Sequence, residues 1–553
     1  CVGVGLGELD EYGRLVSSTW REPETGLHRL ASKVTNTVCL GKGDLANLGD
    51  NCKIMDRIPD ACRRLDQVGA TLMGPVASIA FVCRSCACNA HNAICNRHGK
   101  KAPPCLAGFE AYERWLEAEV YPEFESRYLE EIHKYRDSGE WLAKWPGSKR
   151  DAIDESVQWD RFAPDRVKCM VKREINHKAP TKARLIQFYR TLRTQAFKGP
   201  EFTALQKALT AAMNATTRVH ARSDGAPDIS VTFASGKNAR ELGDWMVKAH
   251  RNARGRRITY YERDGKNWDA TMQERAQRLR ERLYARVDKS LAKFAERCSI
   301  VRGCGVFTGI RLRYKLSYTV KSGHNDTTIG NNIVNAGIVY SCMLRFGVSG
   351  AILVAGDDLL VVVYGDFDAE MFAELEATYG IVPEYRKFHK VSDVTFISGI
   401  WFATDYGYTF TPKPGRLLAR LFWTTNPPPP KQATAYVKGV VLGLWPSVGN
   451  MPVIGKWLDK VYRLYGCAET EEVWESRSST RKREFNEGNN DFDETSKCAF
   501  YDRYRVLECE VADCERMIES MTDPFVYMVH PVLTRMLEVD NAEITDRDAE
   551  GYF

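Results

Sequence analysis

Two adjacent acidic residues, Asp357 and Asp358, stand between two apolar runs at 351–355 and 359–364. This pattern predicts a strand, a tight turn and a second strand, with Gly356 permitting the bend and both carboxylates exposed at the turn. Two carboxylates held side by side repel each other unless a cation neutralises them, and oxygen ligands suit Mg²⁺. An ordinary hairpin would use the same residue types, because glycine and aspartate favour turns. The pair therefore indicates a metal site only if other residues corroborate it.

A third acid, Asp264, follows a predicted short strand at 257–263 and precedes a predicted long amphipathic helix over 271–298. At the end of a strand beside the hairpin, it would add its carboxylate to the same edge of the sheet. Carboxylates shared in this way can hold two ions ~3.5–4 Å apart, as in two-metal phosphoryl transfer. Asp269, five residues further on, has two interpretations at this point, a functional acid and a helix N-cap.

A polar loop that begins at Lys321 lies between these two acidic segments and leads into a predicted helix. Helix capping explains Thr327 without any further role. Capping does not explain Ser322, or Asn331 directed towards the same end of the sheet. A side-chain amide at that place can hydrogen-bond a sugar hydroxyl, with Asp269 as the partner that a buried polar group needs.

Basic side chains are concentrated between residues 161 and 193, where ten lysines and arginines outnumber the acidic residues. Such a run is usually a solvated surface, and it also suits a channel that holds phosphates. The net charge of +6 over 553 residues is too small to indicate a partner by itself. The local concentration is therefore the more informative observation.

The composition describes a folded chain with reduced thiols. Hydrophobic residues make up 44% and aromatic residues 11% of the sequence, which excludes a globally disordered protein. No signal peptide precedes the seventeen cysteines, so we expect free thiols and a cytosolic compartment. No stretch reaches the ~18–20 apolar residues of a membrane-spanning helix. The closest, Val68–Val82, is interrupted by Gly74 and Pro75 and is interpreted as core.

The order of the acidic and polar segments resembles that of the palm motifs A, B and C of viral RNA-dependent RNA polymerases. The pattern D-x4-D begins at Asp264, S-G-x3-T-x3-N begins at Ser322, and G-D-D begins at Gly356. Each motif alone is short, and the resemblance rests on the ordered set.

Three further segments extend this resemblance. The basic stretch from Lys172 to Arg184 is similar to the fingers motif F, 379–390 resembles motif D, and 394–401 resembles motif E. The sequences of motifs A, B and F are most similar to those of the tombusvirus- and nodavirus-like group of positive-strand RNA viruses. Together the similar segments cover about 172–400, under half of the chain.

The resemblance implies an α+β fold shaped as a right hand, with fingers, palm and thumb and an antiparallel palm sheet. The N-terminal region contains nine of the seventeen cysteines and would be an extension that bridges fingers and thumb. The expected boundaries are 1–105 for the extension, 106–255 and 276–315 for the fingers, 256–275 and 316–405 for the palm, and 406–553 for the thumb.

The activity that the resemblance implies is template-directed RNA synthesis, the RNA-directed RNA polymerase reaction that replicates a viral genome. A primer 3′-hydroxyl attacks the α-phosphate of a nucleotide, and two Mg²⁺ or Mn²⁺ ions assist the nucleotidyl transfer. By position, Asp264 and Asp357 would hold both ions, and Asp358 would assist at one of them. Lys387 would protonate the pyrophosphate, with Lys390 as the alternative.

The resemblance also implies which residues bind the nucleotide. Asp269, Ser322 and Asn331 would read the ribose 2′-hydroxyl, and Thr327 would support them. The triphosphate would be met by three basic residues of motif F, namely Lys172, Lys178 and Arg184.

A cysteine–histidine pattern in the N-terminal region has the paired-ligand spacing of a Zn²⁺ site. Buried, reduced thiols that act as small hydrophobic residues are the other interpretation. The candidate zinc ligands are Cys83, Cys86, Cys95 and His98, with Cys88, His91 and Cys105 as alternatives.

Expected partners are the RNA template and product, nucleoside triphosphates, and other replication proteins or host membranes that are contacted indirectly. The expected location is the host cytoplasm, in a membrane-associated replication complex. These expectations follow from the resemblance and not from a membrane-spanning segment.

Two alternative functions have different chemistry. A reverse transcriptase normally has an aromatic residue two places before the paired aspartates and a bulky residue that blocks a 2′-hydroxyl, whereas this chain has Ala355-Gly356 before the pair. A non-catalytic RNA-binding scaffold with a degenerate palm would lack metal-binding acids, all of which are present here. Synthesis from ribonucleotides or deoxyribonucleotides, or binding alone, would separate the three.

Overall fold

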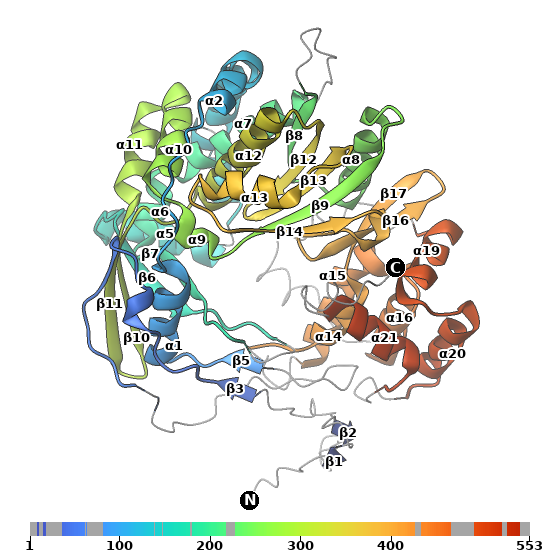
Figure 1. Cartoon of the computed structure of the whole chain (residues 1–553). Helices are drawn as coiled ribbons and strands as arrows, with labels where there is room; N and C mark the ends of the chain where they lie inside the picture. The colour runs from blue at the N-terminus through green and yellow to red at the C-terminus, as the bar shows by residue number, and fades with distance from the viewer. Residues whose placement is uncertain are drawn as a thin grey trace, which may run out of the picture.

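The computed structural model (Figure 1) has a mixed α/β fold in which most strand pairs are antiparallel, which confirms the predicted α+β class at that level. Lys178 and residues 68–80 of the uncharged stretch Val68–Val82 lie outside the described part of the chain. Within the described part, no helix is long and apolar enough to cross a membrane. The structure describes residues 8–9, 15–17, 36–60, 62, 81–137, 139–145, 147–176, 180–216, 227–425, 433–465, 492–522 and 528–541.

A five-stranded sheet, which we call the central sheet, has the strand order β14-β9-β13-β12-β8. Neighbouring strands are antiparallel, except that β12 and β8 are parallel. Strand β8 lies in the range 106–255 that was predicted as fingers, and it pairs with β12 of the central sheet. The strands are β8 (Ile229–Phe233), β9 (Ile258–Gly265), β12 (Gly350–Ala355), β13 (Asp358–Tyr364) and β14 (Pro383–Phe388).

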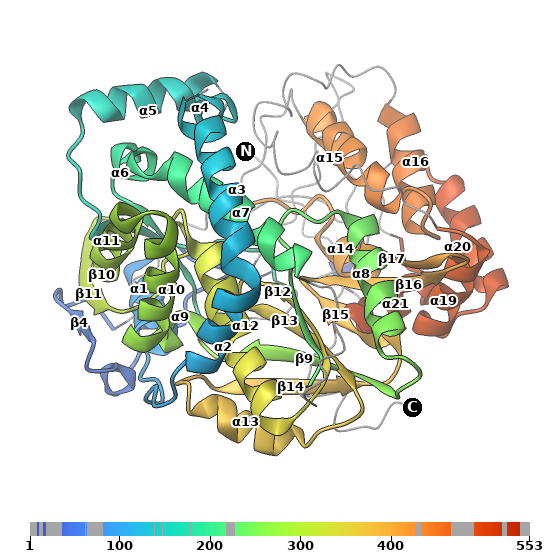
Figure 2. The same ribbon diagram turned by 90° about the horizontal axis from the view of Figure 1, so that it is seen from above.

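Helices cover both faces of the central sheet, which explains why β12 and β13 are almost continuously apolar. Ile352 and Val361 belong to one core with the helices α7, α12 and α13, whereas Leu353 and Val362 belong to another with α8. Figure 2 shows α3 lying across α7 and α12. The bounds are α7 (Gly199–Ala215), α8 (Ala239–Asn252), α12 (Thr327–Phe346) and α13 (Ala369–Ala377).

A small antiparallel sheet of β15, β16 and β17 packs against α8. The indole Nε1 of Trp401 in β16 donates to the carbonyl oxygen of Leu242 in α8 at 3.0 Å. Strand β17 lies in the range 406–553 that was predicted as thumb, and it pairs with β16 of this small sheet. The strands are β15 (Thr395–Phe396), β16 (Gly399–Thr404) and β17 (Gly407–Pro412), after the 3-10 turn η5 (Val391–Asp393).

A second five-stranded sheet, which we call the side sheet, has the order β4-β11-β10-β6-β7. Strand β4 comes from the first 105 residues, and α1 of the same region packs on this sheet. The N-terminal region is therefore part of this core. The elements are β4 (Cys52–Ile54), β6 (Arg166–Val171), β7 (Leu185–Tyr189), β10 (Ile300–Phe307), β11 (Ile310–Ser317), α1 (Ala87–Ala93) and the π-helix η2 (Ile94–His98).

The predicted long helix over 271–298 is two helices, α10 (Glu274–Val287) and α11 (Lys289–Cys298). Asp288 between them has an extended backbone, and its carboxylate accepts from the N–H groups of Ser290 and Leu291. It ends one helix and caps the next, so a single periodic stretch contains a break. The short α9 (Trp268–Thr271) precedes them.

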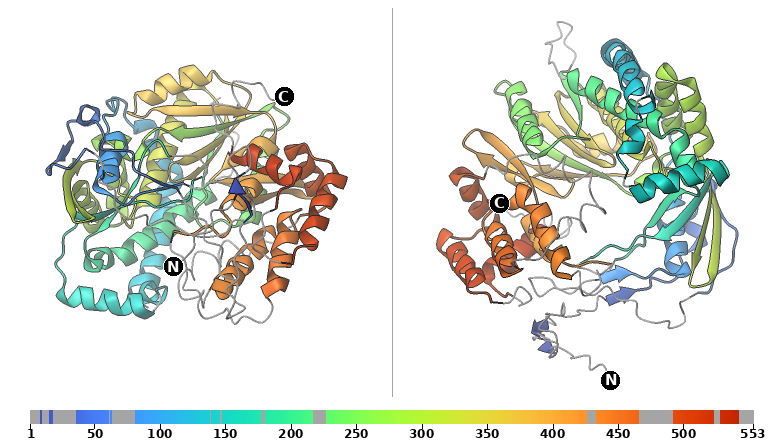
Figure 3. Two further views of the ribbon diagram at one scale, coloured as in Figure 1. Left: turned by 90° about the horizontal axis from the view of Figure 1, so that it is seen from below. Right: turned by 180° about the vertical axis from the view of Figure 1, so that it is seen from behind.

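Six helices form a C-terminal layer with its own core, on the opposite side of the central sheet from the side sheet (Figure 3). Val82 of β5 and Ile175 form a small cluster with Trp423, which follows the first of these helices. The N-terminal region thus contacts both the side sheet and the C-terminal layer. The elements are β5 (Phe81–Cys83), α14 (Pro414–Arg420), α15 (Ala433–Val448), α16 (Ile454–Tyr465), α19 (Glu494–Tyr504), α20 (Glu508–Glu519) and α21 (Pro531–Asn541).

The remaining described elements are short strands of the N-terminal region and helices outside the two large sheets. They are β1 (Glu8–Leu9), β2 (Leu15–Ser17), β3 (Asn36–Val38), η1 (Leu45–Asn47), α2 (Glu110–Trp115), η3 (Leu116–Val120), α3 (Tyr121–Ile132), η4 (His133–Asp137), α4 (Glu140–Ala143), α5 (Gly147–Trp159) and α6 (Leu192–Phe197).

Candidate active site at the end of the central sheet

The paired aspartates lie at a two-residue hairpin turn. Ala355 of β12 pairs with Asp358 of β13, which leaves Gly356 and Asp357 as the turn. Gly356 has a φ of +71°, in the left-handed region that glycine adopts without strain. The predicted strand, turn and strand are thus confirmed, and both carboxylates reach solvent.

The third acid joins this turn through strand pairing. β9 lies antiparallel to β13 with Arg263 opposite Leu359, which places Asp264 beside Asp358. Both turn acids reach solvent, but nearby protein atoms displace part of the water around their carboxylates. Desolvation, followed by the charges of Asp357 and Asp264, raises the pKa of Asp358 to about 7. The three carboxylates thus form one acidic site in which their mutual repulsion is felt.

Two asparagines of α12 hold the turn. The amide oxygen of Asn332 accepts from the N–H of Gly356 at 2.5 Å. The amide nitrogen of Asn335 donates to the carbonyl oxygens of Gly356 and Asp357 at 3.0 and 3.1 Å. The sequence reasoning missed both residues, although two polar side chains three residues apart in an otherwise apolar helix were an available signal.

Asn335 is itself fixed by a buried ion pair on the same face of the sheet. Its amide oxygen accepts from Nη1 of Arg263 at 2.6 Å, and Arg263 forms a fully buried ion pair with Glu376 of α13 at 3.3 Å. Burying this pair raises the pKa of Glu376, while the charge of Arg263 opposes the shift. A buried network thus links α13, β9 and α12 to the acidic turn.

Glu262 is a further acid on the same face of β9 as Asp264, because side chains two residues apart share a face. Its carboxylate forms an ion pair with Arg386 at 2.9 Å and accepts from the hydroxyl of Thr395. The sequence reasoning did not identify it. The charge of Glu262 adds to those that raise the pKa of Asp358.

Asp269 meets two basic side chains of the N-terminal region. Its Oδ2 atom lies 3.3 Å from Nδ1 of His98 and 3.7 Å from Nε of Arg97. Burial raises the pKa of Asp269, and the positive charges of Arg97 and Arg184 oppose the shift. The helix N-cap interpretation is wrong, because Asn267 is the N-cap of α9.

His98 is a neutral side chain that faces Asp269. It was predicted as a zinc ligand, but it does not belong to the group of cysteines that could hold a metal ion. Its Nε2 atom accepts from the N–H of Leu185 at 3.2 Å, so its proton belongs on Nδ1, which faces Asp269. The Nδ1 contact is not a well-aligned hydrogen bond. Burial, together with the charges of Arg97 and Arg184, lowers the pKa of His98 to about 3.

The predicted polar loop packs against β7 of the side sheet. The hydroxyl of Ser322 accepts from the N–H of Gln187 at 3.2 Å. A Cβ atom at Gly323 would lie 2.5 Å from the carbonyl oxygen of Gln187, so this approach requires glycine. Thr327 donates from its hydroxyl to the carbonyl oxygen of Lys321 at 2.6 Å and closes the loop.

Asn331 is buried at 5% exposure, and its amide oxygen has no hydrogen-bond partner among the described residues. The expected contact between Asn331 and Asp269 is not among the described hydrogen bonds. An unpartnered buried amide costs free energy, so this oxygen is available to a ligand donor.

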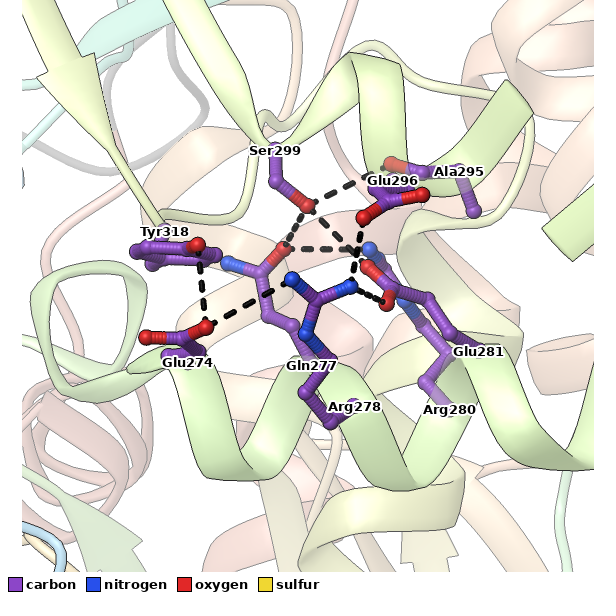
Figure 4. Close-up of polar contacts among 9 residues, drawn as sticks. All are labelled: Glu274, Gln277, Arg278, Arg280, Glu281, Ala295, Glu296, Ser299 and Tyr318. Atoms are coloured by element: carbon purple, nitrogen blue, oxygen red, sulfur yellow. Dashed lines mark hydrogen bonds and ion pairs between the residues drawn. The ribbon is translucent and has the colours of Figure 1, made fainter. Parts of the chain in front are cut away.

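A polar network behind the loop joins α10, α11 and the chain after β11 (Figure 4). Arg278 bridges Glu281 and Glu296 at 2.7 and 2.8 Å. Arg280 donates to Gln277 at 3.1 Å and also forms a buried ion pair at 2.8 Å with Asp326 of the loop. The loop is therefore anchored to a rigid pair of helices.

Lys172 and Arg184 lie side by side next to the ends of β6 and β7. The N–H of Lys172 donates to the carbonyl oxygen of Arg184 at 2.7 Å, and Glu174 lies 2.6 and 3.9 Å from their charged nitrogens. The charge of Arg184 acts on the pKa of both Asp269 and Asp357. Arg184 therefore lies near enough for its charge to act on these two acids.

Lys387 does not face the acids. It lies opposite Tyr261 in the pairing of β14 with β9, three residues before Asp264, and therefore on the other face of the sheet. Its ammonium group is paired with Asp366 at 2.6 Å. The predicted role of Lys387 needs this correction, and Arg416 of α14 is instead a basic residue whose charge acts on the pKa of Asp358.

Four thiols of the N-terminal region lie together and could hold a metal ion, namely Cys39, Cys62, Cys86 and Cys88. This set corrects the predicted one, because it shares only Cys86 with it. Cys95 instead contacts His91 at 3.5 Å, and His91 accepts from the N–H of Gly43. The spacing of cysteines and histidines in the sequence predicted a different set, because α1 and η2 direct Cys95 and His98 towards other parts of the core.

The donor set at the end of the central sheet fits Mg²⁺. Three carboxylates meet there, and oxygen ligands of this kind are the ones that Mg²⁺ prefers. The charge of Arg184 acts on Asp357, and Asn331 directly precedes Asn332, whose amide contacts the turn. A scan against protein-family models and a search of curated proteins find no match for this chain.

Proposed function

We propose that this protein is an RNA-directed RNA polymerase. The observation that carries the proposal is the meeting of Asp264 with Asp357 and Asp358 on adjacent strands. The two segments are far apart in the chain, and strand pairing puts their acids at one sheet end. Nucleotidyl transfer by two divalent ions needs this arrangement of carboxylates.

In this proposal the three parts of the structure correspond to a right hand. The central sheet is the palm, the side sheet and the helices around α3 belong to the fingers, and the C-terminal layer is the thumb. The cluster of Val82, Ile175 and Trp423 supports a bridge between fingers and thumb that involves the N-terminal region.

The acids have separate roles in the proposed reaction. Asp264 and Asp357 would hold two Mg²⁺ or Mn²⁺ ions, and Asp358 would be the accessory ligand. When bound, such ions lower the pKa of an attacking 3′-hydroxyl and neutralise the charge of the leaving pyrophosphate. Asn332 and Asn335 fix the backbone that presents Asp357.

The polar residues beside the acids would select the ribose. The unpartnered amide oxygen of Asn331 can accept from a 2′-hydroxyl, and Asp269 is oriented by its contacts with His98 and Arg97. Ser322 lies in the same anchored loop. The triphosphate would meet Arg184 and Lys172, which lie close to each other next to the ends of their strands.

The two alternatives receive less support. A reverse transcriptase must exclude a 2′-hydroxyl, whereas Asn331 leaves a buried acceptor for one. A non-catalytic scaffold would have no reason to keep three carboxylates next to one another, since their repulsion costs free energy.

The proposal is tested by incubating the purified chain with an RNA template, Mg²⁺, and either NTPs or dNTPs. Extension with NTPs supports it, dNTP preference supports a reverse transcriptase, and RNA binding without synthesis supports a scaffold. Asp366→Asn is a matched control, because Asp366 is an exposed acid just beyond the other end of β13.

A further inference from the structure

We propose that Cys39, Cys62, Cys86 and Cys88 form a structural Zn²⁺ site. The four Sγ atoms lie within 4.8 Å of one another. All four residues are free thiols. They converge from three segments of the chain, so their meeting is not a consequence of local spacing alone.

The distances between the sulfur atoms match a tetrahedral Zn²⁺ centre. A Zn–S bond of ~2.3 Å places the sulfurs of a regular tetrahedron roughly 3.8 Å apart. The Sγ atom of Cys62 lies 3.5 Å from that of Cys39 and 3.7 Å from that of Cys88, and Cys86 lies 3.8 Å from Cys39. These distances are much longer than a disulfide bond of ~2.05 Å.

The surroundings of the thiols suit a closed structural site. Cys86 and Cys88 are buried, and Cys39 and Cys62 are half-buried. The N–H of Asn89 points at the sulfur of Cys86 at 3.5 Å, a type of contact that supports a metal-bound thiolate. Four thiolates select soft or borderline metals over Mg²⁺, and a site without an open position is structural.

The site would fasten two strands to the start of α1. Cys39 directly follows β3, and Cys86 is the N-cap of α1, three residues after β5. Asn89 of α1 reinforces this junction, because its amide accepts from the N–H of Leu40 and donates to the carbonyl oxygens of Val38 and Arg84. The ion would thus tie the segment that includes Cys39 to the start of α1.

The same helical run ends at the proposed ribose-reading residues. α1 continues into η2, whose Arg97 and His98 contact Asp269. Loss of the ion would therefore loosen the element that orients Asp269. This second consequence rests on the proposed function, whereas the presence of the ion does not.

The test is the metal content of the full chain, purified from cells grown with zinc and without chelators. Elemental mass spectrometry should find about one zinc ion per chain, as a single closed site requires. Zinc should be lost in Cys86→Ser and in Cys88→Ser. It should remain in the matched control Cys95→Ser, since Cys95 is a buried thiol of the same region outside the cluster.

A second measurement does not depend on the folding of the variants. The wild-type chain prepared with Co²⁺ in place of Zn²⁺ should show the visible absorption of tetrahedral, thiolate-bound cobalt. Absence of zinc from the wild-type chain, iron in its place, or zinc lost from Cys95→Ser and kept in Cys86→Ser would overturn the proposal. Because metal content is independent of RNA synthesis, failure here is distinguishable from failure of the proposed polymerase function.

Discussion

The side-chain amide of Asn335 donates to the carbonyl oxygen of Asp357 at 3.1 Å. This contact joins the helix that follows the polar loop to the turn that carries the acids. The oxygen of the same amide accepts from the guanidinium group of the buried Arg263, which precedes Asp264 in β9. One side chain therefore sets the position of two segments that supply the carboxylates.

Replacing Asn335 with alanine should remove three hydrogen bonds and leave the buried guanidinium of Arg263 short of one partner. We expect the free energy of unfolding to fall by about 2–4 kcal/mol and nucleotide incorporation to fall at least tenfold. Urea titration and a primer-extension assay measure the two effects. Asn541→Ala, which removes contacts to Gly415 and Leu537 within the C-terminal layer, should leave incorporation unchanged. Equal loss of activity in both variants would contradict a specific role.

Gly323→Ala should push the polar loop away from β7, because the new Cβ atom would lie 2.5 Å from the carbonyl oxygen of Gln187. We expect weaker NTP binding, seen as a rise in KM of roughly tenfold. The free energy of unfolding should fall by less than in Asn335→Ala. Gly147→Ala is the control, since a Cβ atom there meets nothing within 4 Å. An unchanged KM in Gly323→Ala would show that the loop does not help to bind the nucleotide.

His98→Phe should impair the choice between ribose and deoxyribose. The ring is neutral at assay pH, because burial lowers its pKa to about 3, and its Nδ1 atom faces Asp269. We expect the ratio of kcat/KM for NTP to that for dNTP to fall about tenfold, because Asp269 loses a polar contact that orients it. His98→Gln, which keeps a donor, should retain most of the ratio. An unchanged preference for NTP over dNTP in His98→Phe would show that His98 does not help to select the sugar.

Cation binding should depend on pH through Asp358. Its pKa is raised to about 7 without a cation, so below that pH the carboxyl is protonated and must lose its proton before it can bind an ion. The affinity for Mn²⁺, measured by electron paramagnetic resonance, should therefore be about tenfold weaker at pH 6 than at pH 8. In Asp358→Asn this dependence should disappear, and its persistence there would assign the titration to another group.

The hairpin and the third acid were predictable because they depend on local patterns. Two apolar runs around a glycine specify strands and a turn, and an acid after a strand lies at the end of a sheet. The polar loop, including the position of Thr327, also follows from a short segment. These parts of the site use residues that are close in sequence or that end adjacent strands.

The remaining parts depend on contacts that no local pattern contains. His98 reaches Asp269 only because the N-terminal region packs on the side sheet. The face of Lys387 is decided by the register of β14 against β9, since a shift of one residue would reverse it. The cysteine cluster likewise takes Cys39 and Cys62 from outside the spacing pattern.

The most direct test of the central claim is single-nucleotide incorporation by Asp357→Ala beside the wild-type chain. Asp357 is a turn residue that reaches solvent, so its side chain can be shortened without opening the core. The proposed function predicts incorporation by the wild-type chain, none above background by the variant, and the same circular dichroism spectrum and urea midpoint for both. Wild-type rates of incorporation from the correctly folded variant would contradict the assignment of this acidic turn as the catalytic centre.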